Sequence, residues 1–573
     1  MSEWQGRLAE RLKAARGERP VDLLLRGGRV INVFTGELMR TTVAVHDGVV
    51  VGYGDRPAHE VVDLQDAVVS PGFIDGHVHV ESSLLLPAEF ARAVLPHGTT
   101  AVVADPHEIA NVAGLAGIRL MVELSESVGL EVFFMAPSCV PASPLETAGA
   151  ELGAAELETL IRHPRVLGLA EVMNFPGVVA GDAGVLAKIE RFQGRVIDGH
   201  APGLNGPALD AYLCAGIGSD HECTRLEEAR EKLAKGMHIM LREGSQARDL
   251  QALAPLVRPW TATRCMLVSD DCHPEELLER GHMDRILTRA MDLGIDPVTA
   301  IRLVTLSPAQ YFGLRSRGAV APGYQADMAI LGSLRPLRIQ RVYKKGRLVA
   351  AGGRCLLARS PAAGGVSLRS MNLGEVRAED LRIPAQGREM RAIRLAPNTL
   401  ITGEEIVAPT VRDGEAVSDP DRDLLKVAVL ERHRGSGRKG LGFVRGLGIR
   451  GGALASTVAH DSHHLVVVGV ADGDMAVAAN ALRDAGGGLV VVREGTVLAR
   501  LPLPVGGLMS DEPLDQVVTW SREINRAAQG LGAAMEQPFM ALSFLALPVI
   551  PKLKLTDRGL VDVELFRHVP LFV

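Results

Sequence analysis

Two histidines separated by one residue, His77 and His79, are the densest chemical signal in the sequence. They follow the apolar run Gly72-Phe73-Ile74, which has the character of a buried strand. In an extended strand, residues i and i+2 share one face, so both imidazoles can reach the same metal ion. An isolated HxH pair is common by chance, and its meaning depends on the other candidate ligands in the chain.

Histidine and carboxylate side chains recur where later apolar runs end. If these runs are neighbouring parallel strands, their polar ends meet around one mouth. Imidazole and carboxylate donors without a thiolate set suit zinc, manganese or ferrous iron. The segments are Asp105-Pro106-His107-Glu108, Ala170-Glu171-Val172, Asp198-Gly199-His200, Ser219-Asp220-His221-Glu222, Leu241-Arg242-Glu243-Gly244-Ser245 and Ser269-Asp270-Asp271.

The elements that must position these residues alternate between short apolar runs and helix-like segments. Apolar runs of four to six residues recur through the middle of the chain, as at 98–103, 132–136 and 166–170, and a helix-like segment follows each. Strands alternating with helices predict a parallel sheet, and eight such units close a (β/α)₈ TIM-like barrel. We therefore expect an α/β fold with a metal-binding barrel over residues 71–317.

The flanks of this segment have a different rhythm. Residues 21–70 and 318–353 alternate apolar runs with glycine turns, which predicts one composite β-sandwich domain into which the barrel is inserted. Residues 1–20 form a charged amphipathic pattern typical of an N-terminal helix. Residues 371–573 have apolar runs of their own, and we expect an additional C-terminal α/β domain there.

Composition excludes several classes of function. The 573 residues carry a formal charge of −6 and only 4% aromatic residues, so neither a basic footprint nor a base-stacking surface for nucleic acid is expected. No apolar stretch approaches the roughly 20 residues of a membrane helix. The six cysteines are scattered without a CxxC pair, and the N-terminus lacks an apolar signal core, so we expect a cytoplasmic protein.

The motifs together resemble the amidohydrolase superfamily of metal-dependent hydrolases, and within it the bacterial adenine deaminase family. The resemblance runs over the full chain and includes a C-terminal segment rich in histidine. The matching segments are Pro71 to Ser83, Asp105 to Val112, Ala170 to Asn174, Asp198 to Pro202, Ser219 to Glu222, Ser269 to Asp271 and Val458 to His464.

The resemblance implies a site for two divalent metal ions, with manganese or ferrous iron expected and zinc as an alternative. It implies that His77 and His79 bind one ion, that His200 and His221 bind the other, and that Glu171 bridges them. Relatives that hydrolyse cyclic amides use a carboxylated lysine as the bridge, so Glu171 argues against that branch. Asp270 is implied as the aspartate ligand, and Asp271 remains the alternative.

The implied reaction is the hydrolytic deamination of adenine to hypoxanthine and ammonia in purine salvage. Two ions about 3.5–4 Å apart lower the pKa of a shared water from 15.7 to about 7, which supplies a nucleophile. Asp270 is expected to take the proton of this water, Glu243 to protonate the ring, and His107 to shuttle protons or bind metal. Substrate contacts are expected from Glu243, Ser245, Asp271, His460 and Asp461.

Two other functions compete with this interpretation. The same metal set could serve an amidohydrolase that acts on another purine, amidine or cyclic amide. A barrel kept only as a scaffold would show gaps in the ligand set, whereas every implied position here is filled. We expect a homo-oligomer, by default a dimer, because large soluble enzymes commonly form symmetric assemblies.

Overall fold

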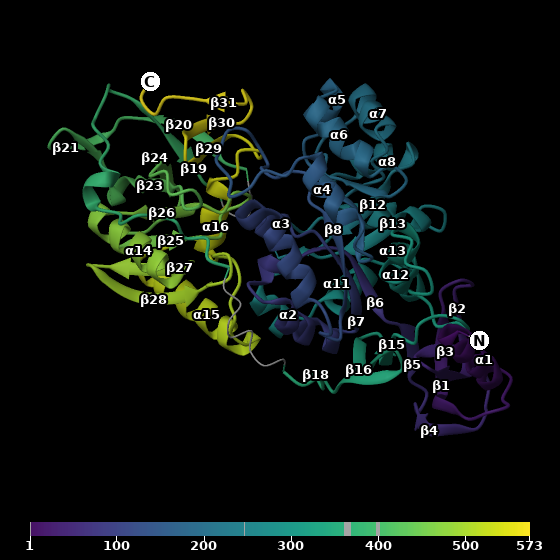
Figure 1. Cartoon of the computed structure of the whole chain (residues 1–573). Coiled ribbons are helices and arrows are strands. Elements are labelled where there is room, and N and C mark those ends of the chain that lie inside the picture. The colour runs from purple at the N-terminus through teal and green to yellow at the C-terminus, as the bar shows by residue number, and fades with distance from the viewer. Residues whose placement is uncertain (1, 246, 360–367, 397–400) are drawn as a thin grey trace.

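The computed structural model describes residues 2–245, 247–359, 368–396 and 401–573. Its elements form three groups, and the central group of strands and helices lies between the N-terminal strands and the C-terminal sheet (Figure 1). None of the helices in these ranges is long and apolar enough to cross a membrane.

Strands from both flanks of the central region form one nine-stranded sheet, in the order β18-β17-β16-β15-β5-β1-β2-β3 with β4 beside β1. Its elements, with the preceding helix, are α1 Glu3–Ala15, β1 Val21–Asn32, β2 Glu37–His46, β3 Val49–Tyr53, β4 Ala58–Asp63, β5 Val68–Pro71, β15 Met328–Leu334, β16 Leu337–Lys344, β17 Arg347–Ala351 and β18 Arg354–Cys355. The two flanks join where β15 pairs antiparallel with β5 and Met328 faces Pro71. Leu25 and Val43 from the first flank share a buried cluster with Ile330 from the second. The segments before and after the central region therefore share one sheet and one core.

The central strands all run parallel to their neighbours. They are β6 Phe73–His79, β7 Thr99–Ala104, β8 Glu131–Ala136, β9 Val166–Val172, β10 Val196–Gly199, β11 Ser219–Asp220, β12 His238–Arg242, β13 Cys265–Val268 and β14 Asp270–Asp271. They form a six-stranded sheet in the order β10-β9-β8-β7-β6-β14 and a three-stranded sheet in the order β11-β12-β13. Contacts join β10 to β11 and β13 to β6, so the two sheets meet at both edges.

Alternation along these strands separates an inner cluster from an outer layer of helices. Ala101 and Val103 of β7 pack in the inner cluster with Met240 of β12, whereas Val102 and Ala104 pack outward. The helices of this region are α2 Pro87–Val94, α3 His107–Leu124, α4 Ala154–Ile161, α5 Phe175–Ala180, α6 Ala183–Arg191, α7 Gly206–Cys214, α8 Leu226–Ala234, α9 Leu250–Leu253, α10 Pro274–Glu279, α11 Met283–Asp292, α12 Pro297–Leu303 and α13 Leu306–Tyr311. Residues at the carboxyl ends of the strands are thereby brought to one edge.

The C-terminal region is built on an eight-stranded sheet that is antiparallel except where β19 pairs with β24. Its elements are β19 Met390–Arg394, β20 Gly403–Val407, β21 Thr410–Arg412, β22 Glu415–Val417, β23 Leu425–Leu430, β24 Lys439–Arg445, β25 Ala453–Ser456, β26 Leu465–Gly469, α14 Asp472–Ala485, β27 Gly488–Arg493, β28 Thr496–Pro502, α15 Leu514–Gly530, α16 Pro538–Leu545, β29 Leu553–Thr556, β30 Gly559–Asp562 and β31 Arg567–His568. Val467 packs beneath Met475 of α14, whereas Val466 and Val468 on the opposite face join the cluster of the central region. This sheet is thus covered by α14 on one face, and α15 and α16 also pack against its strands.

A carboxylate at the start of β8 ties the central strands to the nine-stranded sheet. Glu131 lies 2.6 Å from Arg317 and 3.3 Å from Lys344 of β16. Burial alone would raise the pKa of Glu131, but the two cations bring it from 4.5 to about 2. A lowered pKa contributes stability above pH 4.5 that is lost as the pH falls toward 2, about 3 kcal/mol in total.

We therefore expect Glu131→Gln to lower the unfolding temperature at pH 7. The difference from the parent chain should shrink as the pH falls from 4.5 toward 2, because Glu131 in the parent then loses its charge as well. Calorimetry at pH 7, 4 and 3 measures this difference. A gap that stays constant across the three pH values would show that the ion pairs contribute nothing to stability.

Candidate metal centre

His77 and His79 lie on one face of β6, as their spacing predicts, and both are buried. Their neighbour β14 pairs in parallel with β6, which places Asp270 beside Val78. Asp270 Oδ1 is 3.5 Å from His77 Nε2 and 3.2 Å from His79 Nε2. Asp271 is directed elsewhere, because its Oδ1 accepts a hydrogen bond from Ser82 Oγ at 2.5 Å. The geometry thus favours Asp270 over Asp271 as the partner of the two histidines.

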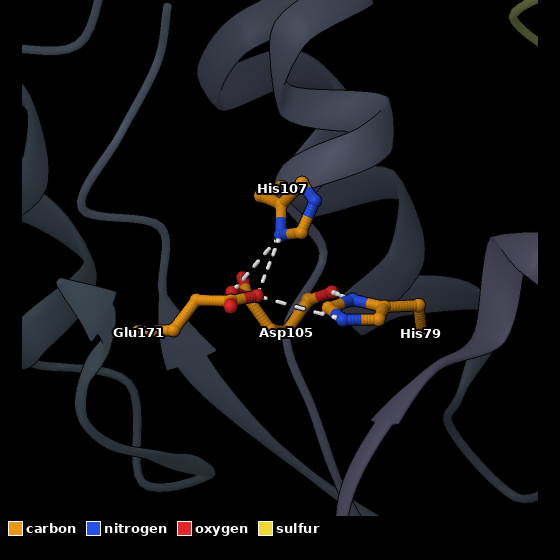
Figure 2. A group of neighbouring side chains, drawn as sticks. All are labelled: His79, Asp105, His107 and Glu171. Carbon is orange, nitrogen blue, oxygen red and sulfur yellow. Dashed lines mark hydrogen bonds and ion pairs between the residues drawn. The ribbon is translucent and has the colours of Figure 1, made fainter. Parts of the chain in front are cut away.

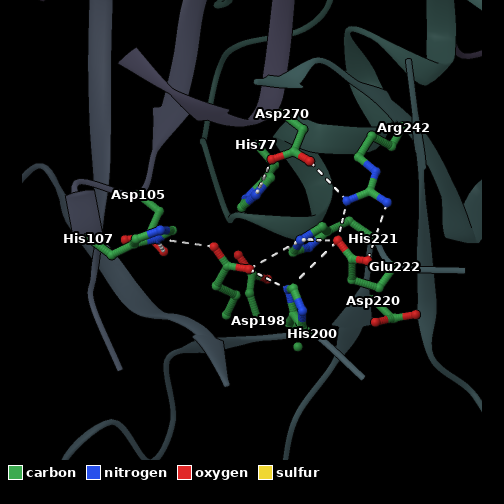
Figure 3. Close-up of polar contacts among 12 residues, drawn as sticks. His77, Asp105, His107, Asp198, His200, Asp220, His221, Glu222, Arg242 and Asp270 are labelled. Carbon is green, nitrogen blue, oxygen red and sulfur yellow. Dashed lines mark hydrogen bonds and ion pairs between the residues drawn. The ribbon is translucent and has the colours of Figure 1, made fainter. Parts of the chain in front are cut away.

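Glu171 at the end of β9 connects this group to two further histidines. Its Oε1 is 3.5 Å from His79 Nε2. Its Oε2 is 2.8 Å from Nδ1 of His200 and 3.2 Å from Nε2 of His221. Figure 3 shows His200 and His221 converging from the ends of neighbouring strands. One carboxylate therefore faces both pairs of histidines, with a different oxygen toward each pair.

This donor set fits divalent metal ions. The side-chain nitrogen and oxygen atoms of His77, Glu171 and His221 lie within 4.8 Å of one another, as do those of His77, His79 and Asp270. His77 Nε2 and Glu171 Oε1 are buried and make no hydrogen bond to the described residues. Buried polar atoms are normally partnered, so two such atoms aimed at one point indicate a ligand.

Both carboxylates of the group are held in the ionised form that binds metal. Burial alone would raise the pKa of Glu171, but His221 and the other surrounding imidazoles bring it well below its usual value. Burial opposes ionisation of Asp270 as well, yet the nearby imidazoles of His77 and His79 and the charge of Arg242 lower its pKa strongly. Ionised carboxylates beside imidazoles are the ligands expected for divalent ions. The chain therefore has a divalent metal-binding site at this edge.

Arg242 and Glu222 extend the centre, and the sequence interpretation missed both. Arg242 Nη1 is 3.0 Å from Asp270 Oδ2 and also contacts Glu222, while Nη2 is 3.1 Å from Asp249 Oδ2 (Figure 3). Glu222 Oε1 is 3.5 Å from His221 Nε2. Arg242 follows the inward-facing Met240 by two residues, and this strand period is the signal that could have revealed it.

His107 and Asp105 lie against the other side of Glu171 (Figure 2). His107 Nδ1 is 3.1 Å from Asp105 Oδ2 and 3.2 Å from Glu171 Oε1. His79 Nδ1 is 3.1 Å from the carbonyl oxygen of Asp105. His107 is thus close enough to exchange a proton with Glu171 or to share a metal with it.

Glu243 does not join this group. It follows the inward-facing Arg242, and the residue before Arg242, Leu241, packs in the outer cluster. Burial raises the pKa of Glu243, and the charges of Arg285 and Arg248 partly offset this effect. Glu243 follows the end of β12, and its expected catalytic role and substrate contact stay predictions.

The Ser245 hydroxyl makes two hydrogen bonds within the protein. Its hydroxyl donates to Glu276 Oε2 at 2.8 Å and accepts from the backbone N–H of His273 at 2.9 Å. These bonds tie the segment after β12 to the start of α10. Ser245 itself is not among the residues that line the cavity described below, so its expected contact with substrate stays a prediction.

We expect Glu243→Gln to keep both bound metal and turnover within about tenfold of the parent chain, less than the 10²–10⁴-fold effect of a general acid. The physical reason is that the charges of Arg285 and Arg248 act on Glu243, whereas no ion pair joins it to the histidines among the described residues. Steady-state rates combined with metal analysis make the comparison. A fall of about 10³-fold in kcat with full metal content would restore Glu243 as the proton donor.

A cavity of about 630 Å³ opens between the strand ends and the C-terminal region. Asp271 and Ser82 line it from the central region, and His460, Phe539 and Met540 line it from the C-terminal region. The ring of His460 stacks on Phe544 with centroids 4.8 Å apart. Two of the expected substrate contacts, Asp271 and His460, therefore border one cavity that needs both regions.

The histidine-rich segment after β25 reaches the centre through Glu108. His460 Nδ1 is 2.7 Å from Glu108 Oε1, and His463 Nε2 contacts Glu108 Oε2. His463 Nδ1 accepts a hydrogen bond from the backbone N–H of Ala459, so neutral His463 carries its proton on Nε2. One ligand atom from each of Glu108, His460 and His463 lies within 4.8 Å of the others, so these three residues form a second group that could hold a metal ion.

Asp461 belongs to the same junction. Its Oδ1 is 4.0 Å from His107 Nε2, and its Oδ2 is buried without a hydrogen bond to the described residues. Burial raises the pKa of Asp461. The C-terminal region therefore contributes an acid beside His107, and its expected contact with substrate stays a prediction.

Comparison with known proteins agrees with this geometry. Residues 68–349 match the family model described as amidohydrolase family, and residues 399–567 match the model described as adenine deaminase C-terminal domain. A protein named adenine deaminase from Syntrophobacter fumaroxidans is 50% identical, with 99% of each chain covered. Another with that name from Desulfatibacillum aliphaticivorans is 48% identical, covering 98% of this chain and 99% of the relative.

Solved structures are more distant. The structure described as enamidase, a member of the amidohydrolase superfamily, is 17% identical with a TM-score of 0.44, and covers 58% of this chain and 96% of that chain. The curated relatives, by contrast, match over nearly the whole length and include both the histidine-bearing strands and the C-terminal region. The chain thus belongs to the adenine deaminase family.

Proposed function

We propose that this chain catalyses the hydrolytic deamination of adenine, in which adenine and water give hypoxanthine and ammonia, as expected in purine salvage. The observation that carries the proposal is Glu171, whose two oxygens face His79 on one side and His200 and His221 on the other. A carboxylate shared between two histidine pairs suits two divalent ions. The relatives named adenine deaminase support the choice of substrate.

The two ions would be held by six residues: His77, His79, Glu171, His200, His221 and Asp270. We expect the ions to be manganese or ferrous iron, with zinc as the alternative. When bound, such ions activate a water molecule for attack at neutral pH. His77 and His79 lie on β6, whereas His200 and His221 directly follow β10 and β11.

Asp270 and His107 are proposed to move the protons. Asp270 lies beside the histidines with its pKa strongly lowered, so it is ionised and can accept a proton from the attacking water. Arg242, 3.0 Å from its other oxygen, fixes the direction of the carboxylate. The amino group of adenine leaves as ammonia after it is protonated, and His107 beside Asp461 can deliver that proton.

The cavity between the two regions is proposed to bind the purine ring. Phe539 and Met540 supply an apolar wall for a flat ring, and Asp271, Ser82 and His460 supply polar groups at its edge. Such a combination of apolar walls with few polar groups is typical of small-molecule sites. Closure by the C-terminal region would also exclude bulk water from the reacting atoms.

We further infer that the two parallel sheets close one (β/α)₈ barrel over residues 71–317, because their edges meet on both sides. The composite β domain would comprise residues 21–70 and 318–353, with the C-terminal domain over 371–573. The free cysteines support a reducing, cytoplasmic location. A homodimer remains a prediction, which light scattering during gel filtration tests.

A substrate panel tests the proposed activity. Ammonia release is measured with adenine, guanine and cytosine, and ring opening of a cyclic amide such as dihydrouracil is followed by liquid chromatography, all at saturating manganese. We expect adenine to be turned over with the largest kcat/KM. Preference for guanine or a cyclic amide would reject adenine and support the alternative amidohydrolase function.

A further inference from the structure

A lysine ammonium is completely buried close to the second histidine pair. Lys232 lies on α8, and its Nζ donates hydrogen bonds to Asp220 Oδ2 at 2.9 Å, to Glu228 Oε1 at 2.8 Å and to the carbonyl oxygen of Ala201 at 2.6 Å. All three of its protons are therefore used. Lys232 and Asp220 have fully buried side chains, so the charges are compensated only by one another and by Glu228.

The partners of Lys232 are the chain neighbours of the two histidines. Ala201 follows His200, and Asp220 precedes His221. The backbone N–H of Ala201 donates to Asp220 Oδ1 at 2.9 Å, while its carbonyl oxygen accepts from Lys232. Both backbone groups of Ala201 are thus held by one ion pair. In Figure 3, Asp220 lies at the lower right below Glu222, away from Asp270 and His77 at the top.

The same network fixes the loop that follows β10. Glu228 Oε1 also accepts the backbone N–H of Gly203 at 2.8 Å, and Cys223 donates its thiol proton to Asp220 Oδ2. The loop itself has no regular secondary structure from His200 to Asn205. Its position relative to β11 therefore depends on the side chains that cross between the two segments.

We propose that Lys232 is a positioning residue that sets the placement of His200 relative to His221, and thereby the affinity of the second metal ion. The proposal rests on the metal ligands assigned above. His77, His79 and Asp270 lie on β6 and β14 and make no hydrogen bond to this network within the described residues. Lys232 therefore acts on one ion and leaves the other largely unaffected.

Stepwise manganese binding to the metal-stripped full-length protein tests this. In Lys232→Met the affinity for one of the two ions should fall by about 10-fold to 100-fold, as is typical for the loss of an outer partner of a ligand. The affinity for the other ion should stay unchanged. His221→Ala identifies the affected step, because it removes a ligand of the second ion directly.

A second variant separates positioning from folding. Lys232→Met leaves the Asp220 carboxylate buried and unpaired, which is strongly destabilising. The double variant Asp220→Asn with Lys232→Met removes that charge, and its second site should still be weakened. Lys235→Met is the matched control at the C-terminal end of the same helix. Lys235 pairs with Asp210 and Glu231, so its loss should leave both affinities unchanged.

Several results of these manganese-binding measurements would overturn the proposal. Wild-type affinity for both ions in either folded Lys232 variant would overturn the proposal, and so would an equal loss at both sites. Failure of both variants to fold, judged by circular dichroism, would assign the network a purely structural role and would also overturn it. A parent chain that binds fewer than two ions would instead contradict the proposed metal centre itself.

Discussion

Glu171→Gln is expected to lose bound metal and activity together, with kcat/KM reduced by at least about 10³-fold. The substitution keeps the size of the side chain but removes the charge that faces four imidazoles. The Glu171 carboxylate has one oxygen near His79 and another near His200 and His221, whereas an amide group has only one oxygen. Metal analysis by mass spectrometry and steady-state rates on the same sample measure both effects.

Glu190→Gln is the matched control for this variant. Glu190 is an exposed residue of α6, so the same chemical change there should leave metal content and rate unaltered. A Glu171→Gln protein that binds two ions and turns over adenine normally would remove Glu171 from the bridging position. Loss of rate with full metal content would instead give Glu171 a role in proton transfer through His107.

Asp270→Asn is expected to lower kcat by about 10³-fold, which is within the range of a lost general base. Asp270 Oδ1 lies close to both His77 and His79, and its strongly lowered pKa makes it an ionised acceptor at neutral pH. The amide cannot accept a proton from the attacking water. Rates measured over a range of adenine concentrations separate this fall in kcat from a change in KM.

Asp271→Asn distinguishes the two adjacent carboxylates that the sequence left open. Asp271 lines the cavity and is bonded to Ser82, so its variant should raise KM more than it lowers kcat. The reverse pattern, with kcat lost in Asp271→Asn and retained in Asp270→Asn, would exchange the roles of the two residues.

The parts of the site that sequence could anticipate are those governed by strand geometry. A spacing of two residues places His77 and His79 on one face, and parallel strand ends bring Glu171, His200 and His221 to the same edge. The structure brings these residues together, although their roles as ligands stay predictions. The sequence also predicts that the two flanks share one sheet, because apolar runs alternate with glycine turns on both sides of the central region.

The parts that sequence could not give depend on packing between distant segments. Lys232 looks like an ordinary charged helix residue, and its burial follows only from where α8 meets the loop after β10. The orientation of Glu243, which follows the end of β12, cannot be read from residue type. In the C-terminal region, apolar runs predicted strands, but they carry no information on pairing direction, which is mostly antiparallel.

The contribution of the C-terminal region was visible in sequence only as a cluster of histidines. Glu108 of α3 accepts hydrogen bonds from this cluster, and the cavity is completed by Phe539 and Met540 of α16. The active site is therefore proposed to be shared between two regions that are far apart in the sequence. Without the C-terminal region, the strand ends of the central region would be exposed to water.

Ammonia release from adenine by the purified chain, stripped of metal and then reloaded separately with manganese, ferrous iron and zinc, tests the central claim most directly. We expect no release from the stripped protein and hypoxanthine in equal amount to ammonia after reloading with manganese or ferrous iron. Full activity in the stripped protein, or none with any of the three metals, would contradict a metal-dependent adenine deaminase.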